Sequence, residues 1–363
     1  MTAPIPTTAT TWRAVLCGIV LFASVDGVVF RTGLYARIAK PESNAGWFVR
    51  RTVLEPELRP ATPPGLVVLG DSTMAEGCIP ELLRTELGVP PPFVRLAAIP
   101  GTTPRVWPFL LDAVPAPPGG WRLTVVGLAT YDDDAPGEAL ADRALDLAFL
   151  GPTLTLREAA GVAADFTSAA ARRDVWLQAA CKSYAWRRDV RDLLASPSER
   201  REVVRRHLWW LHRDEPYAGV ATSLAGARVE GRAIVGLRPE DATAVARLRA
   251  LVWPGDPIDN GAYRRKWLGR LRDRVVATGS ELVLLRVPTQ MLPRAVPRPV
   301  NTTVVDELAR SPHVHVLDAA LFAELERPEF TFDAVHLNRA GAERFTRILA
   351  GELRRRFGAL LQR

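Results

Sequence analysis

The chain has 363 residues, 48% of them hydrophobic and 24% charged, so it can bury a sizeable core and is not globally disordered; its length predicts about two domain-sized units or one domain with a large insertion. Forty-seven Lys and Arg residues against 40 Asp and Glu give a net charge of +7, which favours anionic surfaces such as lipid or acidic polysaccharide but does not by itself indicate nucleic acid. The three cysteines, Cys17, Cys78 and Cys181, are too few and too scattered for a disulfide framework or a thiolate metal site.

The first predicted element is an apolar helix near the N-terminus. Arg13 is followed by residues 14–30, which contain a single charge, Asp26, and reach the lower edge of a membrane-spanning length. No small-residue cleavage site stands out after this run, so we expect a leader and uncleaved anchor within residues 1–35. A helix buried against the domain is the alternative. Five basic residues between positions 31 and 51 follow the run, and by the positive-inside rule they favour a cytoplasmic domain.

A linker is predicted for residues 36–64, where the segments KPES, EPELRP and ATPPG supply turn and breaker signals. Beyond it, short apolar runs typical of buried strands alternate with helical patterns. The five runs are Leu66–Gly70, Phe93–Ile99, Leu123–Ala129, Glu281–Val287 and His313–Leu317. This alternation predicts a parallel five-stranded sheet with helices on both faces, a three-layer α/β/α fold.

The spacing of these runs also predicts an insertion. The gap between the third and fourth runs is too long for one crossover and is mostly helical in pattern. We therefore expect a catalytic domain made of residues 65–135 and 280–363, with a helical subdomain, residues 136–279, inserted into it.

A serine stands where the first predicted strand gives way to a helix, in Gly70-Asp71-Ser72. Ligand sites in open α/β sheets lie at the carboxyl ends of strands, so Ser72 is expected in such a crevice, where its N–H can help to stabilise an oxyanion. The elbow motif G-x-S-x-G is absent because Met74 occupies its last position, which weakens an α/β-hydrolase interpretation. Taken alone, the tripeptide is also an ordinary helix start with Asp or Ser as the cap.

A second candidate element lies near the C-terminus, after the fifth predicted strand. Asp333 and His336 are three residues apart, so the carboxylate can reach the imidazole within one turn and fix its tautomer. The other ring nitrogen then faces a nucleophile. An isolated D-x-x-H is more often a surface turn, but its combination with Ser72 at the same edge of a sheet indicates a catalytic triad.

With these motifs the sequence resembles the SGNH, or GDSL-type, hydrolase family. Gly70-Asp71-Ser72 is similar to the nucleophile block, Ala98-Ile-Pro-Gly101 to the second block, whose glycine N–H contributes to the oxyanion hole, and Asp333 with His336 to the closing block. The resemblance covers about residues 64–131 and 281–363 and leaves out the insertion. It implies a flavodoxin-like sheet and serine ester hydrolysis or acyl transfer.

One block departs from the family pattern. The third block usually offers Gly-x-Asn-Asp, with the Asn donating to the oxyanion, whereas the corresponding strand end here reads Gly127-Leu-Ala-Thr130. The hydroxyl of Thr130 is the predicted replacement donor. The departure is similar to membrane-anchored branches of the family that handle cell-surface polysaccharides, including alginate-acetylation and teichoic-acid-alanylation proteins, which generally face outward.

Together these residues predict an acyl-enzyme mechanism. His336, oriented by Asp333, takes the proton of Ser72, which attacks an ester carbonyl. The N–H groups of Ser72 and Gly101 stabilise the oxyanion, with Thr130 as a third donor. No metal and no organic cofactor is expected, and the sequence contains no Walker loop, dinucleotide fingerprint or H-E-x-x-H motif.

The predicted insertion is rich in cations and aromatic residues. Residues 172–213 contain eleven Lys or Arg against five Asp or Glu. Interleaved with them are Trp176, Tyr184, Trp186, Trp209 and Trp210. Such a surface suits carbohydrate, an anionic glycan or a membrane, and nucleic acid would use the same residue types. The alternative is a solvated basic face whose tryptophans form the core of the subdomain.

Two further histidine pairs are weaker candidates. His313 and His315 alternate on a predicted strand and share a face, but no acidic or cysteine partner is expected nearby, so metal binding is not predicted. His207 and His212 are five residues apart on a helical pattern and do not face one another well.

Three functions remain open: an anchored esterase, an anchored O-acyltransferase acting on a surface polysaccharide, and a glycan-binding or assembly protein with little activity. The first two share an acyl-enzyme and differ in what attacks it. The expected partners are an ester or acylated-glycan substrate, membrane lipid around the N-terminal helix and a membrane acyl-donor protein, with no nucleic acid. By the family resemblance we expect a single-pass membrane protein with an extracytoplasmic catalytic domain, against the local charge count.

Overall fold

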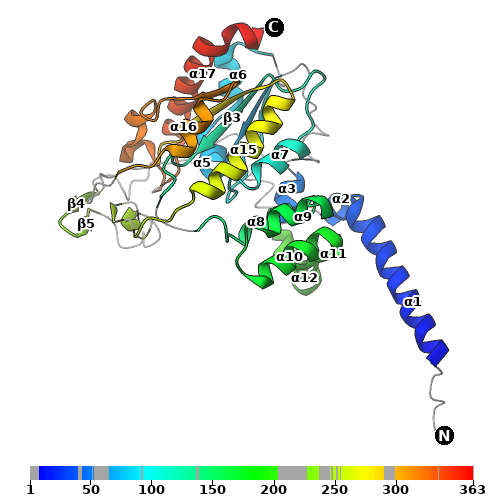
Figure 1. Cartoon of the computed structure of the whole chain (residues 1–363). Helices are drawn as coiled ribbons and strands as arrows, with labels where there is room; N and C mark the ends of the chain where they lie inside the picture. The colour runs from blue at the N-terminus through cyan, green and yellow to red at the C-terminus, as the bar shows by residue number, and fades with distance from the viewer. Residues whose placement is uncertain are drawn as a thin grey trace. The chain divides into compact units, whose positions relative to one another are not determined.

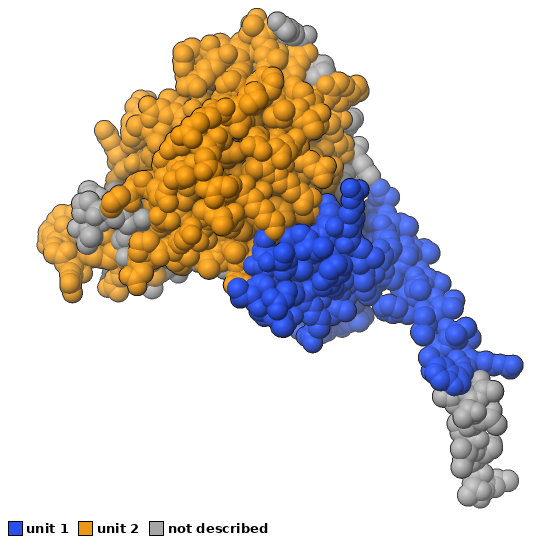
Figure 2. Space-filling view, in the orientation of Figure 1, with its two compact units in different colours: residues 1–50, 147–209 blue, residues 51–146, 210–363 orange. Residues whose placement is uncertain are grey.

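The computed structural model divides into two compact units, coloured separately in Figure 2. The smaller unit joins residues 1–50 to 147–209, and the larger unit joins residues 51–146 to 210–363. The structure describes residues 8–39, 43–50, 52, 65–90, 93–135, 139–202, 227–236, 246, 248–250, 252–253, 255–289, 299–333 and 335–362.

A five-stranded parallel sheet forms the centre of the larger unit (Figure 1). Its strands are β1 (Leu66–Leu69), β2 (Val94–Leu96), β3 (Leu123–Leu128), β6 (Glu281–Arg286) and β7 (Val314–Val316). Each lies within one of the five predicted apolar runs, so the predicted parallel sheet is confirmed. The order across the sheet is β2-β1-β3-β6-β7, the doubly wound order in which ligand sites lie at the switch point between β1 and β3.

Helices cover both faces of this sheet. The helical segments of the larger unit are α5 (Ser72–Gly77), α6 (Pro80–Leu87), α7 (Trp107–Ala113), α15 (Gly261–Ala277), α16 (Thr303–Ala309), α17 (Arg339–Gln362) and the 3₁₀ turns η3 (Ala323–Leu325) and η4 (Pro328–Phe330). Helix α17 packs on α5 and α6, whereas α15 packs on α7, α16 and β6. A short antiparallel hairpin, β4 (Arg228–Glu230) with β5 (Ala233–Val235), completes the described elements of this unit.

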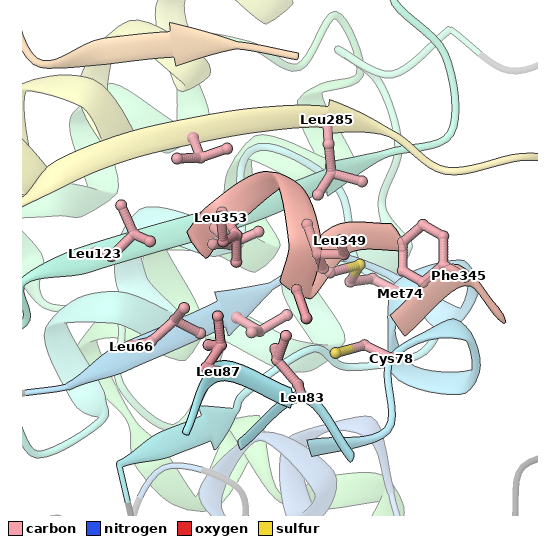
Figure 3. Close-up of a cluster of buried hydrophobic side chains, with 14 of the residues drawn as sticks. Leu66, Met74, Cys78, Leu83, Leu87, Leu123, Leu285, Phe345, Leu349 and Leu353 are labelled. Carbon is pink, nitrogen blue, oxygen red and sulfur yellow. The ribbon is translucent and has the colours of Figure 1, made fainter. Parts of the chain in front are cut away.

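The core beneath α17 follows from the sequence patterns. Every residue of β1 and β3 is buried, as expected for strands covered on both faces. Alternate strand residues point to one face, so Leu66, Leu123 and Leu285 meet Leu349 and Leu353 of α17 in one apolar cluster (Figure 3). This packing fixes the position of the segment that precedes α17.

The predicted insertion, residues 136–279, does not form one structural unit. Its last helix, α15, buries Trp267, Leu268 and Leu271 and lies against the sheet as one of its covering helices. The described hairpin β4–β5 also belongs to the larger unit, whereas residues 147–209 group with the N-terminal segment. The difference arises because buried residues recur every four positions along α15, from Tyr263 to Val275, which gives the helix one face to pack against the sheet.

The smaller unit is helical in its described residues. Its elements are α1 (Thr8–Val25), the π-helical segment η1 (Asp26–Arg31), α2 (Leu34–Ala39), α3 (Asn44–Val49), α9 (Leu156–Ala163), α10 (Ala169–Ala180), α11 (Lys182–Ala185) and α12 (Arg187–Ala195). Helix α8 (Leu145–Leu150) crosses the boundary between the units along the chain. Residues 36–39 and 43–49 therefore differ from the predicted linker, because α2 and α3 bury apolar side chains such as Phe48 in this unit.

Within the described residues, one helix is long and apolar enough to cross a membrane. It runs over Trp12–Arg31, with a mean hydropathy of 2.0 and only 6% of its most apolar window buried, so it is not a core helix of the unit. The one charge in the apolar run, Asp26, accepts hydrogen bonds from the backbone N–H of Ser183 at 2.6 Å and from Nε of Arg31 at 3.0 Å. These hydrogen bonds, made within the smaller unit, offset the free-energy cost of burying the Asp26 carboxylate.

Candidate active site

Ser72 begins α5 at the carboxyl end of β1. The turn between them requires glycine at position 70, which has φ +151°, because a Cβ there would lie 2.6 Å from Cβ of Met74. Asp71 caps α5: its Oδ1 accepts hydrogen bonds from the N–H of Thr73 at 2.9 Å and from its hydroxyl at 2.6 Å. Asp71 is therefore the N-cap, one of the two caps that the sequence allowed, and Ser72 is presented at the edge of the sheet.

Ser72, His336 and Asp333 form a continuous hydrogen-bonded chain. Nε2 of His336 lies 2.8 Å from Oγ of Ser72, and Nδ1 lies 3.0 Å from both carboxylate oxygens of Asp333. A carboxylate can only accept from Nδ1, so we assign the ring proton to Nδ1 and leave Nε2 as the acceptor for the serine hydroxyl. His336 is 8% exposed, which keeps this polar chain largely shielded from water.

The surroundings of Asp333 keep it ionised. Burial alone raises the pKa of this carboxyl, but the hydrogen bond and charge of His336, together with the N–H groups of Val335 and His336 at 2.8 Å each, outweigh burial and lower the pKa to about 2. Asp333 is therefore an anion at neutral pH. It can hold the imidazole in one tautomer and stabilise the imidazolium that forms when Ser72 loses its proton.

Asn338 supports the loop that carries His336, a role that the sequence did not indicate to us. It is buried, its Nδ2 donates to the carbonyl of Glu329 at 2.8 Å, and its Oδ1 accepts from the N–H of Gly341 at 2.9 Å. Gly341 has no room for a side chain, because a Cβ would lie 2.1 Å from the carbonyl oxygen of Phe330. These contacts hold the loop that carries His336. The available signal was an Asn directly before the helical pattern, in an N-cap position.

Gly101 lies in a tight turn at the same edge of the sheet. The N–H of Thr102 donates to the carbonyl of Ile99 at 3.3 Å, and Gly101 has φ +76°, as the third residue of a type II turn with Pro100 before it requires. The turn is tied to the end of β1, since the N–H of Ile99 and the hydroxyl of Thr102 each donate to the carbonyl of Gly70 at 3.1 Å. No described residue accepts a hydrogen bond from the N–H of Gly101.

Thr130 follows β3 at the carboxyl end of the sheet. Its Oγ1 accepts a hydrogen bond from the N–H of Asp132 at 3.0 Å, and its carbonyl accepts from Nη2 of Arg264 at 3.1 Å. Within the described residues, neither Gly101 nor Thr130 is hydrogen-bonded to Ser72. The structure thus brings the three triad residues into contact. It places Gly101 after β2 and Thr130 after β3, the two strands that flank β1.

His313 and His315 have an acidic partner, contrary to the prediction. The pairing of β6 with β7 places Glu281 against both, with Oε1 2.9 Å from Nδ1 of His313 and Oε2 2.8 Å from Nε2 of His315. Because the partner is 32 or more residues away in the sequence, local spacing did not reveal it. No group of three or more His, Cys, Asp or Glu residues suited to a metal ion occurs among the residues searched, and His207 and His212 lie outside the described part of the chain.

The aromatic residues of the basic segment do not share one role. Trp186 is buried in the smaller unit and packs against Tyr35, with ring centroids 5.3 Å apart, so it belongs to the core. Tyr184 donates to Asp174 at 2.6 Å and stacks on the guanidinium of Arg187. Trp176 is exposed. Trp209 and Trp210 lie outside the described residues.

The comparisons with known proteins assign no family: no protein-family model matches the chain, and no curated protein matches it. The chemistry is thus defined by the geometry at the carboxyl edge of the sheet. A hydroxyl, an imidazole and a carboxylate follow one another at hydrogen-bond distances, and the hydroxyl belongs to the first residue of α5. Such an arrangement can activate a serine and stabilise negative charge on a carbonyl that it attacks.

Proposed function

We propose that the chain is a membrane-anchored serine esterase of the SGNH type that hydrolyses ester-linked acyl groups through an acyl-enzyme. The observation that carries the proposal is the hydrogen-bonded chain Ser72–His336–Asp333, in which Nε2 of His336 lies 2.8 Å from Oγ of Ser72. The doubly wound sheet supports it, because the serine follows β1 at the switch point of strand order, where such folds bind ligands.

The mechanism follows from the protonation states. Oγ of Ser72 attacks the ester carbonyl while Nε2 of His336 takes its proton, and the anionic Asp333 stabilises the imidazolium. The N–H groups of Ser72 and Gly101, with the hydroxyl of Thr130 as a third donor, stabilise the tetrahedral oxyanion. The alcohol leaves with the proton from His336. Water, deprotonated by the same nitrogen, then attacks the acyl-serine and releases the acid and the free enzyme.

The apolar helix over Trp12–Arg31 supports anchoring in a membrane. We place the larger unit on the extracytoplasmic side because the family resemblance implies it, against the local charge count. The helix also favours a second candidate function, O-acyl transfer to a surface polysaccharide. An anchored enzyme stays next to a membrane acyl donor, and a sugar hydroxyl in place of water would complete transfer from the same acyl-serine. Hydrolysis and transfer then differ only in the acceptor.

The test uses the full chain in detergent with p-nitrophenyl acetate and a fluorophosphonate probe that labels activated serines. The wild type should turn over the ester and take the label, and Ser72→Ala and His336→Ala should do neither. Ser311→Ala and His315→Ala change the same residue types outside the triad and should behave as the wild type. A folded wild-type chain that neither labels nor hydrolyses any ester tested would overturn the proposal and favour a glycan-binding or assembly protein. Adding a polysaccharide acceptor then separates transfer from hydrolysis.

A further inference from the structure

An arginine holds the turn that contains Gly101 through the carbonyl of that glycine. Nη1 of Arg143 donates to the carbonyl of Gly101 at 2.8 Å and to Oδ1 of Asp146 at 2.8 Å. The side chain of Arg143 is 13% exposed, so it is committed to these contacts more than to water. Together with the hydrogen bonds to Gly70, this contact fixes both sides of the turn.

Arg143 is itself fixed by a buried polar cluster. Asp146 is fully buried; its Oδ2 accepts from the hydroxyl of Thr103 at 2.6 Å and from Nη1 of Arg105 at 3.3 Å. The hydroxyl of Tyr263 lies 2.7 Å from that of Thr103 and accepts from the backbone N–H of Arg105 at 3.1 Å. Thr103 and Arg105 lie two and four residues after Gly101, so the cluster fixes the chain on the C-terminal side of the turn.

A second set of contacts connects the cluster to the segment before Arg143. The guanidinium of Arg105 donates to the carbonyls of Leu140, Ala141 and Arg143. Burying such charges gains little stability over an apolar core, but once satisfied they impose one geometry on their neighbours. Here the geometry imposed is that of the Gly101 turn.

We propose that Arg143 is a positioning residue for the oxyanion hole, acting through the carbonyl of Gly101 to orient the N–H of the same residue. Its catalytic consequence rests on the proposed function; the positioning itself does not. The two backbone dihedrals of Gly101, φ and ψ, relate this N–H to the carbonyl that Arg143 holds. Glycine at φ +76° has wide conformational freedom, so an external contact is needed to keep one orientation.

The first test is kinetic. Arg143→Met keeps much of the side-chain volume and removes the donors. It should lower kcat by about 10–100-fold, less than the roughly 10²–10³ lost with a whole oxyanion donor, and leave KM within about twofold because only the transition state carries the oxyanion. Arg143→Lys keeps one donor and should retain more of kcat. Arg265→Met, which removes an exposed arginine paired with Glu307, is the matched control and should change neither constant.

The second test does not need activity. Amide hydrogen exchange of Thr102, whose N–H closes the turn on Ile99, should rise at least about tenfold in Arg143→Met and remain at the wild-type rate in Arg265→Met. Unchanged exchange in a folded Arg143→Met, or in Arg143→Lys if the first variant does not fold, overturns the positioning role. If the wild type itself lacks esterase activity, the proposed function fails and exchange still decides the role of Arg143. Faster exchange with unchanged kcat would overturn its connection to catalysis.

Discussion

Two sets of carboxylate–histidine hydrogen bonds lie at opposite edges of the same sheet. At the carboxyl edge Asp333 holds His336, whose other nitrogen reaches Ser72. At the amino edge, Glu281 bonds His313 and His315 at similar distances, 2.9 and 2.8 Å. The second set is half exposed, and the ring of His315 packs edge-on against Phe357. A carboxylate–histidine pair alone therefore does not mark a catalytic site. The hydroxyl of Ser72 at hydrogen-bond distance from the imidazole distinguishes the first set.

The largest effect is expected when the carboxylate of the first set is neutralised. Asp333→Asn keeps the volume but presents an amide to Nδ1, which favours the wrong tautomer of His336. We expect kcat to fall by about 10⁴-fold, the loss typical of this change in serine triads. Steady-state kinetics with p-nitrophenyl acetate measures it. Retention of more than a tenth of the wild-type kcat would contradict the orienting role of Asp333.

The next largest effect concerns the predicted third oxyanion donor. Thr130→Val removes the hydroxyl and preserves the shape of the side chain. If the hydroxyl donates in the transition state, kcat falls by about 10²–10³-fold. Thr130→Ser is the matched control, because it keeps the hydroxyl and should stay within about tenfold of the wild type. Equal rates for the valine and serine variants would remove Thr130 from the mechanism.

The carboxylate of Asp333 also makes stability depend on pH. Its pKa is lowered to about 2 in the folded chain, against about 3.9 in an unfolded chain, so its ionisation stabilises the fold above that range and the contribution is lost as the pH falls toward 2. The free energy of unfolding of the wild type should exceed that of Asp333→Asn by on the order of 2 kcal/mol near neutral pH, with the difference shrinking between about pH 4 and pH 2. Urea unfolding at several pH values measures it. A difference that stays constant over this interval would contradict the assignment.

The smallest effect is expected at the amino edge. Glu281→Gln weakens the hydrogen bonds to His313 and His315, whose side chains are 55% and 37% exposed. Exposed pairs of this kind contribute up to about 1 kcal/mol, so the free energy of unfolding should change by less than that and kcat should not change. Kinetics and urea unfolding of the same preparation check both. A large loss of kcat would mean that the second set is coupled to the site.

The sequence alone identified the features that depend on local patterns. Five apolar runs predicted the five strands, because a strand covered on both faces must be apolar throughout. The N-terminal helix was readable from length and hydropathy. Ser72, Asp333 and His336 were found because each lies next to a recognisable strand end or helix start.

Features that depend on contacts between distant segments became visible only in the folded chain. Parallel pairing of β6 with β7 placed Glu281 against His313 and His315, and the fold of the larger unit placed Arg143 against Gly101. Packing assigned α15 to the sheet and residues 147–209 to the N-terminal segment. These outcomes depend on which buried surfaces are complementary in shape and charge. Such complementarity leaves no periodic pattern along the chain, so it cannot be recognised from the sequence.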